Sequence, residues 1–461
     1  MGEIDIFDNI SPLDFRYYGR SKALDKLKPY LSETGFISYL AKVEAALAMA
    51  LAKHKICSEK IAKEIEKASK RVTAEEVYQE EDRIKHNIRA LANAIRNKVS
   101  DEAKPYVHFS ATSHDIMCSA DSARYKDFTN DVLLETLLEF EKTLIQLALR
   151  EKSTLQIGRT HGQHAEPITF GFAIAQYVSR FGKRIQKIKD AANNLRGKLA
   201  GAVGAYNASS LFIKDAELFE QDVMDYLGIK ASPISTQVVE AEYITDYVHN
   251  IVSAFGIIAN LADDMRHLQR SELNEVAEEF EAKQVGSSTM PHKRNPINFE
   301  NVKSMWKEFM PRMTTVYMDQ ICEHQRDLTN SASSRFIPEV LAALYVSVNR
   351  MNRVMSKLVL DKDSLKKNFD KNKDMIAAEP AYMLLAAFNH PDAHEYIREL
   401  TLKSQKENKP LQTLIFADKD LKPYLDKMNP AQKEIIKNPE KYVGLAEKKT
   451  KDICKEWQEK L

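Results

Sequence analysis

The chain has 461 residues, and its 67 lysines and arginines nearly cancel its 66 aspartates and glutamates, so the net charge of +1 does not favour a nucleic-acid-binding protein. Hydrophobic residues make up 44% and charged residues 29%, which excludes a disordered chain and predicts a globular protein of two or three domains. Only 14 glycines and 15 prolines interrupt the chain, so we expect long helices rather than sandwiches, barrels or Rossmann loops.

The N-terminal third is predicted to form short charged helices. Apolar residues recur there at helical spacing over 41–56, 58–71 and 81–97. His86 lies inside the third of these helices, where a surface or capping role and a functional role are equally open.

Two later segments predict longer helices. Residues 119–153 contain no glycine or proline, and apolar residues recur along them every three or four positions. Residues 250–280 carry a similar stripe, from Ile251 to Leu268. At ~1.5 Å per residue each helix would span roughly 45 Å, so we expect such helices to pack side by side in a bundle.

The last hundred residues are rich in lysine and broken by prolines, which predicts short amphipathic helices. We found neither an internal repeat nor a low-complexity linker. We therefore predict an all-α protein of three tightly docked helical domains, over 1–106, 107–358 (with a loop at 283–297) and 359–461.

The four cysteines and the apolar runs bear on the cellular compartment. Cys57, Cys118, Cys322 and Cys454 are too far apart to form a metal clip and indicate reduced thiols. No run approaches ~18 uncharged apolar residues, and the first residues lack the apolar region of a secretion signal. We expect a cytoplasmic protein without a membrane span.

Three stretches lack the composition of a helix interior: 108–121, 158–171 and 283–301. The third places hydroxyls ahead of Lys293 and Asn295, a point charge and an amide donor that together can grip a carboxylate. For any single stretch a solvated loop is the plainer interpretation. Three such stretches in one helical chain favour a functional site.

His161 and His164 raise the question of a metal. Neither a cysteine nor a further histidine lies in register with them, so we do not expect zinc. His161 stands between Thr160 and Gly162, where the backbone can present the imidazole. A functional role is therefore favoured over that of a buried core histidine.

Two arginines frame hydroxyls and amides in the segment RDLTNSASSR. Arg326 and Arg335 have the planar fork that suits an oxyanion such as phosphate. An interhelical salt-bridge site is equally open for this segment.

At these stretches the sequence resembles the fumarase/aspartase superfamily. GSSTMPHKRNP (286–296) is similar to its signature loop, and ATSHD and GRTHGQHAEP match its other two active-site regions in order. Within the superfamily the resemblance is to the adenylosuccinate lyases, and it rests on SPLDFRY, IKHN, RTHGQHAEPITFG, STQVVE, RHLQRSE and RDLTNSASSR. It covers essentially the whole chain.

This resemblance implies a fold and an assembly. The family fold is all-α with three domains, and the central long-helix bundle forms the core of a homotetramer. Each active site takes residues from three subunits.

The resemblance also implies a reaction, the β-elimination of fumarate by cleavage of a carbon–nitrogen bond, without a metal or an organic cofactor. The family's substrates are small nucleotides of purine synthesis: adenylosuccinate, which gives AMP, and the succinyl-aminoimidazole carboxamide ribotide. Ser287 matches the general base, with Ser288 as the fallback, and His161 matches the general acid. His86 matches a second active-site histidine that orients the substrate.

The substrate-binding positions follow from the same resemblance. Lys293 and Asn295 match the residues that bind the carboxylate onto which negative charge spreads during the reaction. The other positions are Thr112 and Ser113 at the fumaryl carboxylate, Arg16 and Tyr17 at the nucleotide, Arg326, Ser331 and Arg335 at the phosphate and ribose, and Gln237, Lys85 and Asn87.

The sequence departs from the family pattern at two positions, and two alternative functions remain open. Lys85 and Asn87 stand where the family has Arg and Asp, and the change to lysine loses a bidentate fork. Another lyase of the superfamily is one rival: argininosuccinate lyase, aspartase, fumarase or carboxymuconate cycloisomerase. A crystallin-like scaffold without activity is the other, although the presence of Ser287, His161 and Lys293 together argues against it.

Overall fold

The computed structural model describes residues 9–17, 19, 23–279, 289–290 and 292–460. The chain divides into two units. Unit 1 comprises Met1–Glu139, Lys183–Ala259 and Val302–Arg350, and unit 2 comprises Phe140–Gly182, Asn260–Asn301 and Met351–Leu461. The helices with residues in both units are α7 (Leu134–Arg150), α8 (Phe170–Asn193), α10 (Glu242–Leu268), α11 (Ile297–Phe309) and α13 (Ile337–Met355).

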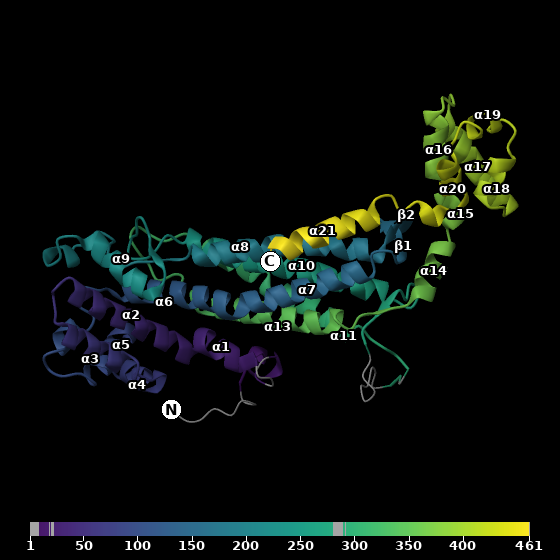
Figure 1. The fold of residues 1–461 in the computed structure, drawn as a ribbon. Coiled ribbons are helices and arrows are strands. Elements are labelled where there is room, and N and C mark those ends of the chain that lie inside the picture. Colours follow the sequence, from purple (N-terminus) through teal and green to yellow (C-terminus); the bar gives the residue numbers. More distant parts are fainter. Residues whose placement is uncertain (1–8, 18, 20–22, 280–288, 291, 461) are drawn as a thin grey trace. The chain divides into compact units, whose positions relative to one another are not determined.

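Helix α2 (Glu33–Lys53) is the centre of unit 1. It contacts α3 (Glu59–Ser69), α6 (Ser113–Phe128) and α9 (Ala216–Leu227), which surround it in Figure 1. By length and composition α2 could cross a membrane, yet 72% of its apolar 18-residue stretch is buried in the protein. We therefore interpret α2 as a core helix.

The predicted helix over 81–97 is interrupted, which corrects that expectation. Helix α4 (Ala74–Ile84) ends at Lys85, whose φ of 59° is left-handed, and α5 (Asn87–Arg96) begins after His86. The imidazole Nδ1 of His86 accepts the backbone N–H of Arg89 at 3.2 Å. His86 therefore caps a helix rather than lying inside one, because its ring can satisfy an otherwise unpaired N–H.

The two long helices are found, with different ends. Residues 119–150 lie in one nearly continuous helical run, α6 and α7 joined by the π-helical turn Thr129–Leu133, and residues 151–153 form a turn. This run begins at Ser113, so nine of the fourteen residues in the stretch 108–121 are helical, which corrects that expectation. Helix α10 stops at Leu268 instead of continuing to 280.

The remaining elements of unit 1 are short. They are α1 (Ala23–Leu31), α12 (Arg312–Met318), the π-helical turn Leu13–Tyr17, the 3-10 turns Lys104–Tyr106, Ser209–Leu211 and Ser333–Phe336, and the parallel pair β3 (Arg196–Gly197) and β4 (Lys230–Ala231).

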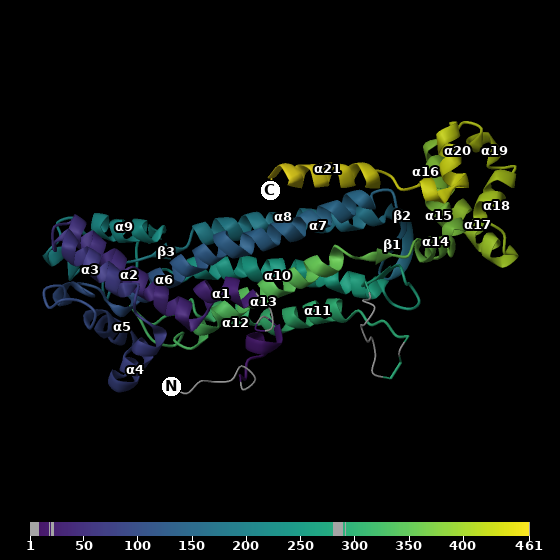
Figure 2. The same cartoon turned by 60° about the horizontal axis from the view of Figure 1, so that its bottom comes forward.

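Unit 2 contains a hairpin and a cluster of short helices. Strands β1 (Leu155–Thr160) and β2 (Gln163–Thr169) pair antiparallel. The short helices gather around their own apolar core (Figure 2) and comprise α15 (Lys373–Ile376), α16 (Ala378–Ala387), α17 (Ala393–Glu407), α18 (Leu411–Ala417), α19 (Lys422–Leu425) and α20 (Pro430–Lys437). Unit 2 also holds α14 (Lys362–Asp370), the turn Pro439–Lys441 and the pair β5 (Val276–Ala277) and β6 (Val359–Leu360).

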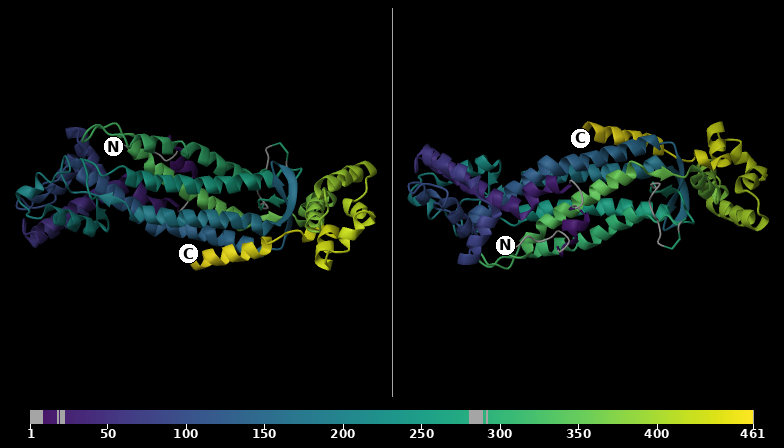
Figure 3. Two further views of the ribbon diagram at one scale, coloured as in Figure 1. Left: turned by 90° about the horizontal axis from the view of Figure 1, so that it is seen from above. Right: turned by 90° about the horizontal axis from the view of Figure 1, so that it is seen from below.

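The last helix, α21 (Ala446–Lys460), packs on α7 and α8 (Figure 3). The ring of Trp457 lies against Gly182, where an added Cβ would come within 2.5 Å of it. The Cys454 thiol points to the carbonyl of Ile145. The all-α class is confirmed, whereas the division into three domains stays a prediction.

Candidate active site

A hairpin turn in unit 2 presents His161. Strand residues Thr160 and Gln163 pair directly, which leaves His161 and Gly162 as a two-residue turn with φ of 54° and 76°. Positive φ at both positions is the geometry of a type I′ turn, in which glycine is favoured second. The His161 side chain is exposed. The sequence correctly indicated that the backbone presents this imidazole.

A buried carboxylate fixes the base of this hairpin. Glu275 is fully buried and accepts hydrogen bonds from Arg159 Nη2 at 2.5 Å, Gln156 Nε2 at 2.9 Å and Asn368 Nδ2 at 2.9 Å. Charge-assisted bonds of this kind hold geometry firmly. Sequence reasoning missed Glu275, because nothing in the local pattern connects it with an arginine far earlier in the chain.

Lys293 and Asn295 line a cavity of about 1780 Å³ within unit 2. Gly162 and His164 of the hairpin also line it, whereas His161 does not. Burial, followed by the charges of Arg159 and Lys371, lowers the pKa of His164. Ser287 and its fallback Ser288 lie outside the described residues.

Unit 1 contains a cavity of about 1590 Å³ that gathers most of the other predicted residues. Those that line it are Lys85, His86, Asn87, Ser113, Gln237, Arg326, Ser331 and Arg335. Thr112, Arg16 and Tyr17 do not, although Asp14, in the same π-helical turn as Arg16 and Tyr17, does. The structure thus brings together residues that are spread over 250 positions of sequence, from Lys85 to Arg335.

The N-terminus of α6 forms one wall of this cavity and is held by Asp115. This fully buried carboxylate accepts the backbone N–H of Thr112 at 2.8 Å, pairs with Lys198 and accepts the N–H of Ala200 at 3.1 Å. The acid three residues after a threonine is typical of a helix start, so a capping-box search would have found it. Asp115 thereby places Ser113 at the cavity.

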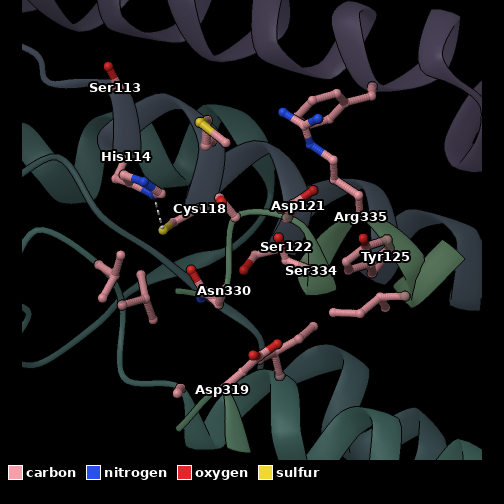
Figure 4. Close-up of a pocket in the computed structure, with 18 of the residues that line it drawn as sticks. Ser113, His114, Cys118, Asp121, Ser122, Tyr125, Asp319, Asn330, Ser334 and Arg335 are labelled. Carbon is pink, nitrogen blue, oxygen red and sulfur yellow. Dashed lines mark hydrogen bonds between the residues drawn. The ribbon is translucent and has the colours of Figure 1, made fainter. Parts of the chain in front are cut away.

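The segment that follows α12 forms another wall. Arg326 Nη1 donates to Asn330 Oδ1 at 2.8 Å, and the Ser333 hydroxyl donates to Asp319 at 2.8 Å. Gln237 lies beside this segment, since its N–H donates to the carbonyl of Gln325 at 3.4 Å. Figure 4 shows Arg335, Ser334 and Asn330 around the cavity.

Both positively and negatively charged side chains line this cavity. Lys85, Arg326 and Arg335 line it, together with Asp121, Asp319 and Glu81. Asp121 pairs with Arg124 at 2.7 Å, while burial raises the pKa of this carboxyl. The arginines of the 326–335 segment therefore remain available to an anionic ligand.

Within the described part of the chain, no three His, Cys, Asp or Glu side chains lie close enough to hold a metal ion.

The chain matches two protein families in succession. Residues 10–310 match the lyase family, and residues 322–434 match the C-terminal domain of adenylosuccinate lyase. The first match contains the hairpin of unit 2, and the two matches together contain all residues that line the unit 1 cavity except Asn9, Val316, Asp319 and Gln320.

Individual adenylosuccinate lyases are similar to this chain over most of its length. The chain is 33% identical over 453 residues to an adenylosuccinate lyase of Archaeoglobus fulgidus, covering 97% of this chain and 98% of that protein. It is 34% identical to that of Pyrococcus horikoshii, covering 96% and 97%, and 32% identical to that of Bacillus subtilis, covering 73% and 77%.

Solved structures support the fold. A 3-carboxy-cis,cis-muconate lactonizing enzyme from Pseudomonas putida superposes with a TM-score of 0.83 at 20% identity, covering 98% of this chain and 99% of that one. A fumarate lyase from Mesorhizobium sp. BNC1 gives 0.82 at 22% identity, covering 95% and 99%. From its sequence, its two family matches and this fold, the chain belongs to the adenylosuccinate lyase family.

Proposed function

We propose that this lyase releases fumarate by β-elimination from adenylosuccinate, giving AMP, and from the succinyl-aminoimidazole carboxamide ribotide of purine synthesis. The observation that carries the proposal is the full-length likeness to adenylosuccinate lyases, joined to a cavity whose walls carry the arginines and hydroxyls a nucleotide requires. A scaffold protein would not require these side chains.

The chemistry requires a base, an acid and a carboxylate clamp. Ser287 removes a proton from the carbon next to a carboxylate, and the charge spreads into that carboxylate as a dianion. Lys293 and Asn295 bind it, and losing one such donor typically costs ~2.7–4 kcal/mol of transition-state stabilisation. His161 protonates the departing nitrogen as the carbon–nitrogen bond breaks.

The cavity of unit 1 binds and orients the substrate. Ser113 offers a hydroxyl to a carboxylate, and Arg326 and Arg335 suit a phosphate. Because Nδ1 of His86 accepts the N–H of Arg89, the other ring nitrogen carries the proton that His86 can offer to the substrate. Thr112, Arg16, Tyr17, Gln237, Ser331, Lys85 and Asn87 keep their proposed binding roles.

We further propose a cytoplasmic homotetramer in which three subunits contribute to each active site. The exposure of His161 supports this, because an acid that protonates a leaving group works best where water is excluded. A neighbouring subunit can supply that cover. The reaction needs neither metal nor organic cofactor.

The first test is a substrate panel read by fumarate release. We expect adenylosuccinate and the ribotide to be cleaved, and argininosuccinate, aspartate and malate to be left intact. Cleavage of argininosuccinate or aspartate alone would overturn the substrate assignment. Lack of activity on every compound would favour the scaffold.

The second test concerns the shared sites. Ser287→Ala and His161→Ala should each abolish turnover while the tetramer persists on size-exclusion chromatography. Mixing the two inactive variants under conditions that exchange subunits should restore part of the activity, because some sites then combine an intact Ser287 with an intact His161. No recovery, despite proven exchange, would place both residues in one subunit.

A further inference from the structure

His114 lies on the wall of the unit 1 cavity, and the proposed mechanism does not use it. It follows Ser113 in the first turn of α6 and lines the cavity (Figure 4). Its Nδ1 lies 3.7 Å from the Sγ of Cys118, one helical turn further on. In the part of the chain that the structure describes, its Nε2 has no hydrogen-bond partner.

The neighbouring thiol determines which nitrogen of His114 carries hydrogen. Burial raises the pKa of Cys118 to about 11, so the sulfur keeps its proton at neutral pH. The S–H can then donate to Nδ1, and the hydrogen of a neutral imidazole lies on Nε2. The ring thus offers one N–H donor that the protein itself leaves unused.

The charges around His114 keep it neutral. Burial, followed by the positive charges of Arg326 and Lys198, lowers its pKa to about 4. Lys198 is neutralised by its ion pair with Asp115. His114 is therefore a neutral donor beside a cation at any physiological pH.

Arg326 has an unused donor of its own. Its Nη1 donates to Asn330 and its Nε is buried, while its Nη2 makes no hydrogen bond among the described residues. A donor on a cation that the protein leaves unpaired is available to a ligand. An oxyanion in this cavity would meet the guanidinium of Arg326 and the imidazole of His114 together.

We propose that His114 is a substrate-binding residue, whose Nε2–H donates a hydrogen bond to the same oxyanion that Arg326 binds. This rests on the proposed function for the identity of the substrate, whose oxyanions are a carboxylate and a phosphate. Ser113 on one side is expected to bind the carboxylate, and Arg326 on the other the phosphate. A neutral donor adds direction to the binding without adding a third positive charge.

Binding of two simple anions to the full-length protein tests this without any turnover. Calorimetry measures fumarate and inorganic phosphate, separately, with the native chain and with His114→Phe, which keeps a ring but removes the donor. We expect inorganic phosphate to bind about 10- to 100-fold more weakly to the variant, the loss typical of one hydrogen bond to a charged group, and fumarate to bind as it does to the native chain. A loss confined to fumarate would place His114 at the carboxylate instead and would overturn the pairing with Arg326.

Two further variants make the result specific. His114→Asn keeps an N–H donor and should lose less affinity than His114→Phe. His54→Gln is the matched control, since His54 is also largely buried in unit 1 but pairs with Asp222 and does not line the cavity. Its anion affinities should be those of the native chain.

The proposal is overturned if His114→Phe binds both anions as the native chain does, if both weaken equally, or if the native chain binds neither. Should His114→Phe fail to fold, as judged by its thermal melt, His114→Ala compared with His114→Asn decides on the same criteria. Failure of the proposed function would show differently, as intact anion binding by a native chain that releases no fumarate from adenylosuccinate.

Discussion

The unit 1 cavity and the β1–β2 hairpin of unit 2 hold their functional side chains in place in different ways. In the cavity, hydrogen bonds with the backbone place the functional side chains: the buried Asp115 holds the start of α6, and the exposed His86 is held as a helix cap. In the hairpin, His161 stands exposed at a turn, and only the base of the hairpin is secured, by Glu275. The substrate-binding groups of unit 1 are thus already held in position, whereas the proposed acid, His161, is still exposed to solvent.

The largest expected effect tests the hairpin tip. His161→Ala should lower kcat by about 10²- to 10⁴-fold, the usual contribution of a general acid. The melting temperature should not change, because the exposed side chain contributes no buried contact. Fumarate release at saturating adenylosuccinate and a thermal melt measure the two quantities.

The neighbouring Gln163→Ala is the control for that variant, since Gln163 is also exposed and pairs with Thr160 across the turn. It should turn over normally. A His161→Ala protein with near-normal kcat would remove the contrast between an acid on the hairpin and a binding site in the cavity.

The base of the hairpin comes next. Glu275→Ala leaves Arg159 largely buried without its partner, and removing one partner of a buried pair typically costs 3–5 kcal/mol. We expect a loss of that size in the free energy of unfolding, measured in urea. Glu279→Ala, which breaks the exposed ion pair with Lys357, should cost less than about 1 kcal/mol. Equal losses would show that the Glu275 cluster does not secure the hairpin.

A smaller effect tests the cavity. Arg335→Ala should raise the KM for adenylosuccinate about 10- to 100-fold, because the phosphate loses a charge-assisted hydrogen bond. Its kcat should change less. Arg83→Ala is the control, since Arg83 is exposed, pairs with Glu80 and does not line the cavity. An unchanged KM for Arg335→Ala would argue against a phosphate at this wall.

The smallest effect concerns a carboxyl group that, unlike Glu275, is buried without partners. Both oxygens of Glu141 in α7 lack hydrogen bonds among the described residues, and burial raises its pKa from 4.5 to about 9. The folded protein therefore holds a proton that the unfolded chain releases above pH 4.5. Stability should fall as the pH rises from about 4.5 to about 9.

Glu141→Leu should remove that dependence, so it should stabilise the protein by about 1–3 kcal/mol near pH 5, the usual cost of an unsatisfied buried polar group, and by more at pH 8. Urea unfolding at pH 5 and pH 8 measures the difference between variant and native chain. A native chain whose stability does not change over this range, relative to the variant, would contradict the burial of Glu141.

Much of the fold was predictable, because it depends on local pattern. The apolar stripes located the helical run through 119–150 and most of α10, and the motif stretches named residues that do line the two cavities. The prediction was wrong about two helix boundaries: α10 ends at Leu268 instead of continuing to 280, and the helix predicted over 81–97 is broken at Lys85. Both depend on a backbone that leaves the helix while the apolar spacing continues.

The candidate site was predictable where local residue chemistry or the resemblance named a residue. Asp115, Glu275 and His114 were missed, since their importance lies in what they touch. Glu275 acts through Arg159, 116 positions away. His114 has an unused N–H donor because Cys118 lies at its other ring nitrogen, and it stays neutral because burial, followed by the charges of Arg326 and Lys198, lowers its pKa.

By itself, the sequence determined that this protein is helical, that it belongs with the lyases and which side chains we propose for its chemistry, because periodicity and motifs are properties of neighbouring residues. Only the tertiary structure decided where the helices end, which carboxylates are satisfied and that His161 is exposed. Those outcomes depend on burial and on hydrogen bonds between residues far apart in the chain, whose cost or gain exists only once the chain has folded.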